Sequence, residues 1–470
     1  MNLHLDLDPT DGRLARQLAR ALRDAIQGGR LGPQTVLPPT RRMASDLGIS
    51  RGPVIEAYEQ LIAEGYLTAR QGSGTRVAPH APGAAPASSA LMADLAATMA
   101  VPPQLPTPSD IRIDLRPILP DLALFPRTQW AEAYQRAART AAHRELAYPP
   151  PAGVAALRTA LAGHLRRVRD VRIPPGEVVV TAGQTQAVAA IARALQAAGH
   201  TTIAVEDPGD PREHQVLRSV GLHTVGVAVD SAGLDVAALR TTDARAVLVT
   251  PGHHYPSGVS MSPHRRADLV AWSRTVDGII IEDDYDSELR FERRSIPALQ
   301  SLAPERVVLA GSVTKTLAPA LRLGWVVAPA TLARAVVAER ASTDFGSASL
   351  DQLALADLLA SGAYSKHLRG AVAQYRLRRQ ALLAALAHHL PRASVRGAPI
   401  GLHVCLELAG VAAEENAIVR AAAGLGVAVC GIGPMRLDVA GPPALVLGYG
   451  QVSHRALTQA AAALAKAIGA

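Results

Sequence analysis

The sequence predicts an α/β protein with two unequal folded parts. Three amphipathic stretches followed by a glycine-turned hairpin occupy residues 1–79 and predict a small helical domain with a hairpin. Residues 80–112 are rich in Ala, Pro and Ser and predict an interdomain linker, with one short helix at 90–100. Residues 113–470 alternate apolar, strand-like runs with helical patterns, which predicts a large, doubly wound, mostly parallel sheet. A small α+β portion is expected from about residue 335.

The composition favours a cytoplasmic protein with large apolar cores. Apolar residues make up 49% of the 470 positions and aromatic residues only 3%, so Ala, Leu and Val must fill the interior. Cys405 and Cys430 are too few for a disulfide framework. No apolar run has the length needed to cross a bilayer, and the N-terminus lacks a secretory signal. We therefore expect a cytoplasmic location and no membrane association.

The charge permits nucleic-acid binding but does not establish it. The net charge is +8, yet residues 1–80 hold ten Arg against eight Asp and Glu. Basic charge is therefore not concentrated at the N-terminus. A claim of DNA binding has to come from a motif and from the placement of its residues.

Three helices are predicted at the N-terminus. Residues 12–30 carry apolar side chains at helical spacing and end at Gly28. A second helix is predicted to have Thr40 as its N-cap and Gly48 as its left-handed stop. Ser50 is the predicted N-cap of the third helix, in whose first turn a proline is tolerated. The side chains predicted to face inward from the third helix are Val54, Tyr58, Leu61 and Ile62.

A hairpin follows the third helix. Residues 66–70 and 75–77 read as two strands, joined by a turn that contains Gly72 and Gly74. Two short helices around a glycine turn, followed by a hairpin, have the order of a winged helix-turn-helix. The alternative is a small helical bundle with a hairpin that has no role in binding.

Residues 13–79 resemble the winged helix-turn-helix of GntR-type regulators. The resemblance implies that the second and third helices and the wing lie against operator DNA. Pro53 stands where the family often has a hydroxyl residue, so a hydrogen-bond donor is missing and the base preference is not carried over. The motifs that carry the resemblance are Leu37-Pro38, Arg41, Leu47-Gly48-Ile49-Ser50-Arg51, Ala57-Tyr58, Gly65-Tyr66-Leu67 and Gly72-Ser73-Gly74-Thr75. The DNA-facing residues implied are Arg41, Ser50, Arg51, Gly52, Pro53 and Gly72.

The large part is predicted from its apolar runs. Helical patterns between several of these runs favour a sheet covered on both faces. The predicted strands are 178–180, 202–205, 225–229, 246–249, 278–281 and 307–310. The predicted helices are 128–142, 153–168, 350–388 and 411–425.

Lys315 is the residue around which we interpret the large domain. The chain holds 48 Lys and Arg, and only Lys315, Lys366 and Lys466 are lysine. A guanidinium stays protonated, whereas an ammonium group can lose its proton and attack a carbonyl. Lys315 follows a predicted buried strand, at the end where open α/β sheets bind ligands. These features favour a Schiff-base lysine for pyridoxal phosphate (PLP), against the alternative of an ordinary surface lysine.

Other residues of the large domain suit the same cofactor. Strand 278–281 runs into Glu282-Asp283-Asp284-Tyr285-Asp286, where Asp283 can face the pyridine nitrogen and Tyr285 the ring oxygen. A carboxylate cluster also suits a metal, but with Lys315 downstream the cofactor is favoured, and no metal site is predicted. The residues that suit the phosphate are Gly183 and Gln184 at a strand-to-helix turn, with Ser312 and Arg322.

Residues 113–468 resemble the fold-type I PLP aminotransferases. With the N-terminal module, the chain resembles the MocR/GabR subfamily of GntR regulators. The resemblance implies that Lys315 bonds to the cofactor, that Tyr148 reaches across from a second subunit of a homodimer, and that Arg212 grips an effector carboxylate. The segments that carry it are Tyr148…Gly153…Leu157-Arg158, Thr181-Ala182-Gly183, Glu206-Asp207-Pro208-Gly209, Thr250-Pro251…Tyr255-Pro256-Ser257-Gly258, Glu282 to Glu288, and the Lys315 stretch. The full cofactor set implied is Lys315, Asp283, Tyr285, Gly183, Gln184, Ser312, Arg322, Tyr148 and Tyr255.

Three positions depart from the subfamily. Asp210 replaces a tyrosine that stacks on the cofactor, and we expect it to point away while His253 or His254 covers the ring. His254 itself occupies a usual glutamine position. Val446 stands where many aminotransferases carry the arginine that binds the substrate carboxylate, with Arg436 nearby as a possible second effector-binding residue.

Three functions follow from these residues. The favoured one is a PLP-dependent DNA-binding transcription regulator that senses PLP, or an amine or amino acid reacting with PLP at Lys315. The second is a working aminotransferase whose N-terminal domain only localises it. The third is a sensor of another small molecule on an aminotransferase scaffold without PLP. The departures argue against catalytic turnover, although half-transamination stays compatible with the residues.

Overall fold

The computed structural model divides the chain into two compact units, Met1–Pro106 and Thr107–Ala470. The predicted helix at 90–100 and nearly all of the predicted linker lie outside the described residues. The residues that the structure describes are 12–70, 74–79, 81, 110–117, 119–292, 296–408, 411 and 413–469. Among them, no helix combines the length and apolar character needed to span a bilayer.

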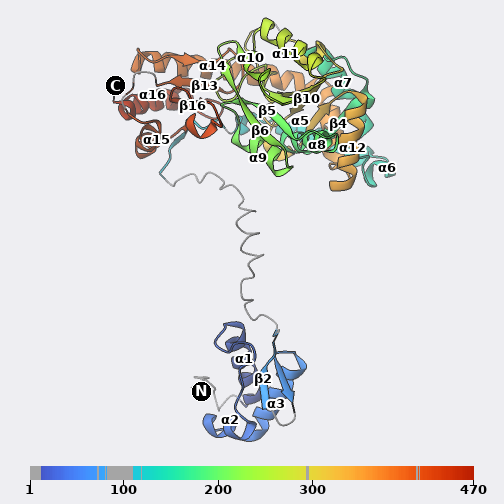
Figure 1. The fold of residues 1–470 in the computed structure, drawn as a ribbon, viewed down its shortest axis with the longest axis vertical. Coiled ribbons are helices and arrows are strands. Elements are labelled where there is room, and N and C mark those ends of the chain that lie inside the picture. The colour runs from blue at the N-terminus through green and yellow to red at the C-terminus, as the bar shows by residue number, and fades with distance from the viewer. Residues whose placement is uncertain are drawn as a thin grey trace. The chain divides into compact units, whose positions relative to one another are not determined.

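The N-terminal unit is a three-helix domain with a hairpin (Figure 1). Leu18, Leu22 and Leu61 are fully buried where α1 packs on α3. Gly48 ends α2 in the left-handed region at φ +64°, as predicted. The hairpin strands pair antiparallel from Leu67 opposite Val77. The elements are α1 Leu14–Gln27, α2 Thr40–Leu47, α3 Arg51–Ala63, β1 Leu67–Arg70 and β2 Gly74–Val77.

Two local predictions for these helices are wrong. Thr40 is the first residue of α2 rather than its N-cap, because the preceding Pro39 takes that place; the Thr40 hydroxyl accepts a hydrogen bond from Arg51 Nε at 3.1 Å. Ile62 is 38% exposed, because Val54, Tyr58 and Leu61 already fill the buried stripe of α3 and the next residue turns away from it. Ser50 does occupy the N-cap of α3, without a side-chain capping bond.

The large unit is built on an eight-stranded sheet in the order β4-β11-β10-β9-β8-β5-β6-β7. Its central strands β6, β5, β8, β9 and β10 are parallel neighbours, and β11 runs antiparallel between β10 and β4. The predicted doubly wound, mostly parallel sheet is therefore confirmed. The strands are β4 Val178–Thr181, β5 Thr202–Asp207, β6 His223–Asp230, β7 Gly233–Leu234, β8 Ala246–Val249, β9 Ile279–Asp284, β10 Val307–Ser312 and β11 Gly324–Val327.

Helices cover both faces of this sheet (Figure 1). Val179 belongs to the core under α8, α9 and α12, whereas its neighbours Val178 and Val180 belong to the core under α7 and α13. This alternation is what a strand buried on both faces requires. The helices are α5 Arg127–Thr140, α6 His143–Leu146, α7 Ala155–Arg169, α8 Gln184–Ala197, α9 Pro211–Ser219, α10 Val236–Leu239, α11 Pro263–Thr275, α12 Ala330–Thr343 and α13 Ser349–Ala360.

The C-terminal portion is a smaller α+β layer, as predicted. Its four-stranded antiparallel sheet has the order β12-β13-β16-β15 and packs with α14, α15 and α16. The single helix predicted at 350–388 is two helices, because Gly362 interrupts it at φ +75°. The elements are α14 Ala363–His389, β12 Val395–Arg396, β13 His403–Glu407, α15 Glu415–Gly424, β14 Val427–Ala428, β15 Cys430–Gly431, β16 Ala444–Gly448 and α16 His454–Ile468; β14 pairs in parallel with β3 Ile113–Asp114.

Candidate cofactor and effector site

A cavity of about 290 Å³ lies where the central strands of the large sheet end. Its lining includes Val205, Leu248, Asp283 and Ser312, which come from β5, β8, β9 and β10. The carboxyl ends of these parallel strands meet at one edge, where ligands bind in open α/β sheets. Of the predicted cofactor and effector residues, those that line the cavity are Lys315, Asp283, Tyr285, Gln184, Ser312, Arg322, Tyr255 and Arg212.

Lys315 lies in this cavity in the turn after β10. Its Nζ is 3.4 Å from the carbonyl oxygen of Pro117. Removal from bulk water, followed by the charge of Arg212, lowers the pKa of Lys315 to about 8, although nearby carboxylates act in the opposite direction. A far larger fraction of its amine is therefore neutral near pH 7 than for an ordinary lysine, as nucleophilic attack requires.

The run of carboxylates at the end of β9 is divided between two faces of the strand. Glu282 and Asp284 both reach the buried guanidinium of Arg169, with Asp284 Oδ2 at 2.8 Å from Nε and Glu282 Oε1 at 3.3 Å from Nη2. Asp283, between them, faces the cavity. The period-two geometry of a strand thus separates one cavity carboxyl from two structural ones.

Asp283 shares its environment with Glu213, which the sequence analysis missed. Burial, followed by the charge of Glu213 and a hydrogen bond with it, holds the pKa of Asp283 well above its usual range. Burial and the charge of Asp210 raise the pKa of Glu213 to about 7. Gln184 Nε2, an amide predicted to bind the phosphate, also donates to Asp283 Oδ1 at 2.5 Å. Because the two buried carboxyls lie close together, the state in which both are ionised is disfavoured.

The N-terminus of α8 suits an anion beside two residues of the cavity lining, Gln184 and Arg322. Gly183, the N-cap of α8, has φ +86°, and a Cβ there would lie 2.9–3.0 Å from the guanidinium of Arg322. Arg322 Nη2 donates to the carbonyl of Ala182 at 2.6 Å, which fixes the cation beside the helix N-terminus. Ser312 contributes a hydroxyl to the cavity lining. A helix N-terminus, a guanidinium and a hydroxyl form an anion cradle that only glycine leaves open.

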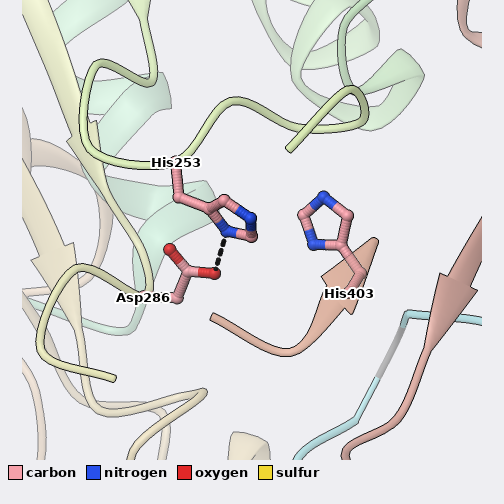
Figure 2. Close-up of side chains that lie close together, drawn as sticks. All are labelled: His253, Asp286 and His403. Carbon is pink, nitrogen blue, oxygen red and sulfur yellow. Dashed lines mark hydrogen bonds and ion pairs between the residues drawn. The ribbon is translucent and has the colours of Figure 1, made fainter. Parts of the chain in front are cut away.

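Tyr285 contacts a buried polar cluster of His253, Asp286 and His403, the last two of which also line the cavity. Its hydroxyl donates to the carbonyl of His253 at 2.8 Å, and the ring of His253 is hydrogen-bonded through Nδ1 to Asp286 Oδ2 at 2.8 Å. Figure 2 shows the rings of His253 and His403 facing each other; their centroids are 4.4 Å apart. Candidate ligand atoms of His253, Asp286 and His403 lie within 4.8 Å of one another, so these residues could hold a metal ion.

Neither of the two histidines expected to cover the cofactor ring lines the cavity. His253 is absent from the cavity lining, and the buried His254 hydrogen-bonds through Nδ1 to Ser257 at 2.7 Å. Asp210 does line the cavity. Its carboxylate is turned toward Arg212, with Oδ2 at 2.6 Å from Nη2. Burial opposes the ionisation of Asp210, but hydrogen bonds from Arg212 prevail and keep its pKa below the ordinary value.

The remaining predicted residues lie outside this cavity. Arg436 Nη2 donates to the carbonyl of Pro442 at 2.9 Å, so its guanidinium is hydrogen-bonded within the loop that precedes β16. Val446 is fully buried in the C-terminal sheet. Tyr148 is 89% exposed and contacts the exposed ring of Phe345, with centroids 6.2 Å apart.

The predicted DNA-facing residues gather at the start of α2 and α3. Arg41, Ser50, Arg51 and Gly52 are exposed, and Pro53 is half-buried in the first turn of α3. The hydrogen bond from Arg51 to Thr40 brings the two helix N-termini together. Gly72 lies outside the described residues.

Comparisons with known proteins identify both modules. Residues 14–77 match the bacterial regulatory proteins of the gntR family, and residues 120–464 match aminotransferase class I and II. The HTH-type pyridoxine biosynthesis transcriptional regulator PdxR of Corynebacterium glutamicum is 34% identical over 85% of this chain and 84% of its own. The probable rhizopine catabolism regulatory protein MocR of Rhizobium meliloti is 33% identical over 97% and 94%. The chain belongs to the MocR/GabR subfamily of GntR-type transcription regulators.

Solved structures share the large unit of this MocR-type regulator. An archaeal alanine:glyoxylate aminotransferase is 26% identical, with a TM-score of 0.70 over 80% of this chain and 92% of its own. The α-aminoadipate aminotransferase LysN of Thermus thermophilus, complexed with N-(5'-phosphopyridoxyl)-L-leucine, is also 26% identical, with a TM-score of 0.69 over 77% and 92%. The large unit therefore has the aminotransferase fold.

Proposed function

We propose that this MocR-type regulator binds operator DNA through its N-terminal domain and senses PLP, or an amine or amino acid that reacts with PLP held at Lys315. The observation that carries the proposal is the lysine amine of lowered pKa in a cavity that also holds Asp283 and an anion cradle. Bound PLP would supply an electrophilic aldehyde and an electron-accepting ring. Lys315 would hold the aldehyde carbon, Asp283 the ring nitrogen, and Ser312 with Arg322 the phosphate.

The names of the relatives bear on the two proposed signals, which are PLP itself and a small molecule that reacts with PLP. One relative is a pyridoxine biosynthesis transcriptional regulator and another a probable rhizopine catabolism regulatory protein, so a vitamin B6 compound and a small molecule to be broken down are both reasonable signals. The signal acts by binding more tightly to one arrangement of the large and DNA-binding domains than to another. The protein does this in the cytoplasm, where it meets its operator.

We propose a homodimer as the functional form. Tyr148, Phe345 and Leu146 are 89%, 63% and 59% exposed, and the first two are in ring contact. Large apolar side chains exposed together are typical of an interaction surface. A dimer would place two DNA-binding domains on two half-sites, and the predicted reach of Tyr148 into a second subunit belongs to the same proposal.

A direct test combines cofactor fixation with DNA binding. Full-length protein is incubated with PLP, reduced with borohydride and digested, and we expect mass spectrometry to find the pyridoxyl group on Lys315. A DNA site selected from a random pool by the full-length protein is then titrated with and without PLP by fluorescence anisotropy. We expect PLP, alone or with an added amine, to change the DNA affinity. DNA binding that is indifferent to PLP and amines would exclude the proposed sensing, and steady turnover of an amino donor and a keto acid would favour an enzyme.

Substitution of Arg51 tests the DNA-binding half. Arg51 begins α3 with an exposed side chain held by Thr40, a position from which it can reach a base edge or a phosphate. We expect Arg51→Ala to weaken binding to the selected DNA by about 10- to 100-fold, which corresponds to about 1–3 kcal/mol. Arg20→Ala, an exposed arginine on α1, serves as the control and should change the affinity little. Equal effects of the two substitutions would contradict the placement of α3 on DNA.

A further inference from the structure

The guanidinium of Arg212 is already occupied by a carboxylate of the chain itself. Asp210 Oδ2 lies 2.6 Å from Nη2, and both carboxylate oxygens accept from Nε at 3.1 and 3.2 Å. Asp210 Oδ1 also accepts from the backbone N–H of Arg212 at 2.9 Å, which makes Asp210 the N-cap of α9. One carboxylate thus serves two purposes, and its displacement would remove a helix cap as well as an ion pair.

Other positive groups of the cavity are committed elsewhere. Arg322 is held at the anion cradle by the carbonyl of Ala182, and the amine of Lys315 is the group that meets an aldehyde. Glu213 and Asp283 also line the cavity, and neither can offer a positive charge to an incoming carboxylate. An incoming carboxylate would therefore meet the ionised Asp210 at the guanidinium of Arg212.

We propose that Asp210 makes this cavity select amines that lack a carboxylate, such as monoamines and diamines, and reject amino acids. The inference rests on the proposed function, because the amine is taken to react with PLP at Lys315. To bind Arg212, an amino-acid carboxylate would have to displace Asp210 or lose its hydration beside a like charge. An uncharged or cationic end leaves the Asp210–Arg212 pair intact, and a cationic end is also attracted by the acidic wall.

The test compares amines of equal chain length on PLP-loaded, full-length protein. Butylamine, 1,4-diaminobutane and 4-aminobutyrate are titrated by calorimetry and by the cofactor's absorbance. We expect the two amines without a carboxylate to bind at least tenfold more tightly than 4-aminobutyrate. In Asp210→Asn, which keeps a good N-cap but frees the guanidinium, we expect 4-aminobutyrate to gain at least tenfold and butylamine to change less than threefold. Asp235→Asn is the matched control, since Asp235 caps α10 outside the cavity lining.

The outcomes distinguish a failure of the selection by Asp210 from a failure of the proposed PLP sensing. Equal or tighter binding of 4-aminobutyrate to the natural protein overturns the selection, as does a ratio of affinities that Asp210→Asn leaves unchanged. Binding of none of the three amines to a protein that has taken up PLP also overturns it, while PLP sensing itself stands. A protein that takes up no PLP overturns the proposed function and the selection together. A gain of 4-aminobutyrate binding in Asp235→Asn would assign the effect to helix capping rather than to the freed Arg212.

Discussion

Lys315→Ala is expected to abolish the covalent capture of PLP and, with it, the response of DNA binding to PLP or amines. Alanine has no group that can bond to the aldehyde, while the anion cradle around Gly183 and Arg322 stays in place. The measurements are borohydride fixation followed by mass spectrometry and titration of the selected DNA with and without PLP. Lys366→Ala, which removes an exposed lysine on α14, is the control and should behave as the natural protein does.

The pH dependence of capture gives an independent check on Lys315. Burial and Arg212 lower its pKa to about 8, so at pH 7 about one amine in ten is neutral, against about one in three thousand for a lysine with the ordinary pKa of 10.5. Only the neutral amine attacks, so the rate of capture should rise about tenfold per pH unit below pH 8 and level off above it. A rate that keeps rising to pH 10 would mean that Lys315 titrates as an ordinary lysine.

Arg169→Met is expected to cause the largest loss of stability among single substitutions near the cavity. Arg169 is 3% exposed and is the shared partner of Glu282 and Asp284; it also donates through Nη1 to the carbonyl of Ile296. Burial opposes the charge of Arg169, but the two carboxylates outweigh it and raise its pKa. Without the guanidinium, two buried carboxyls lose their partner, which costs about 3–5 kcal/mol.

Calorimetry of the full-length protein measures this loss. The melting transition of the large unit should fall by at least about 5 °C in Arg169→Met. Arg172→Met is the matched control, because Arg172 is 76% exposed in its side chain and lies 3.7 Å from Asp170, a surface pair worth little. An unchanged transition in Arg169→Met would mean that the end of β9 does not depend on this ion pair.

The sequence was most informative where apolar residues form a continuous run, as in a buried strand, or a stripe at helical spacing. The central strands are apolar on both faces, and the buried stripes of α1 and α3 follow the helical repeat, so fold class and strand positions could be predicted. The short strand β11, Gly324–Val327, was missed because four residues after a turn carry little periodic signal. The break at Gly362 was missed because apolar spacing continues on both sides of it. Thr40 shows how a residue typical of an N-cap can bind a neighbouring side chain instead.

The cavity residues also divide into those that the sequence could predict and those that it could not. Lys315, Asp283 and Gly183 could be found because each follows or ends a strand whose direction the sequence predicts. Glu213 could not be found by that route, since its contact with Asp283 joins α9 to the end of β9, and the two lie far apart in the sequence. The signal available in the sequence was a pair of acidic residues three apart, Asp210 and Glu213, which lie at the N-cap and in the first turn of α9. The pairing of Asp210 with Arg212 required the backbone conformation at the start of α9.

The segment that opens the large unit has a mechanical consequence. Strand β3, Ile113–Asp114, is paired with β14, and Leu115 accepts a backbone hydrogen bond from Gly448. A few residues on, Pro117 and Leu119 form part of the cavity wall, and the Pro117 carbonyl faces the Lys315 amine. The first described residues of the large unit thus lie beside Lys315. Under the proposed function, an occupant that displaced Pro117 and Leu119 would displace the neighbouring strand β3 with them, without any change passing through the large sheet.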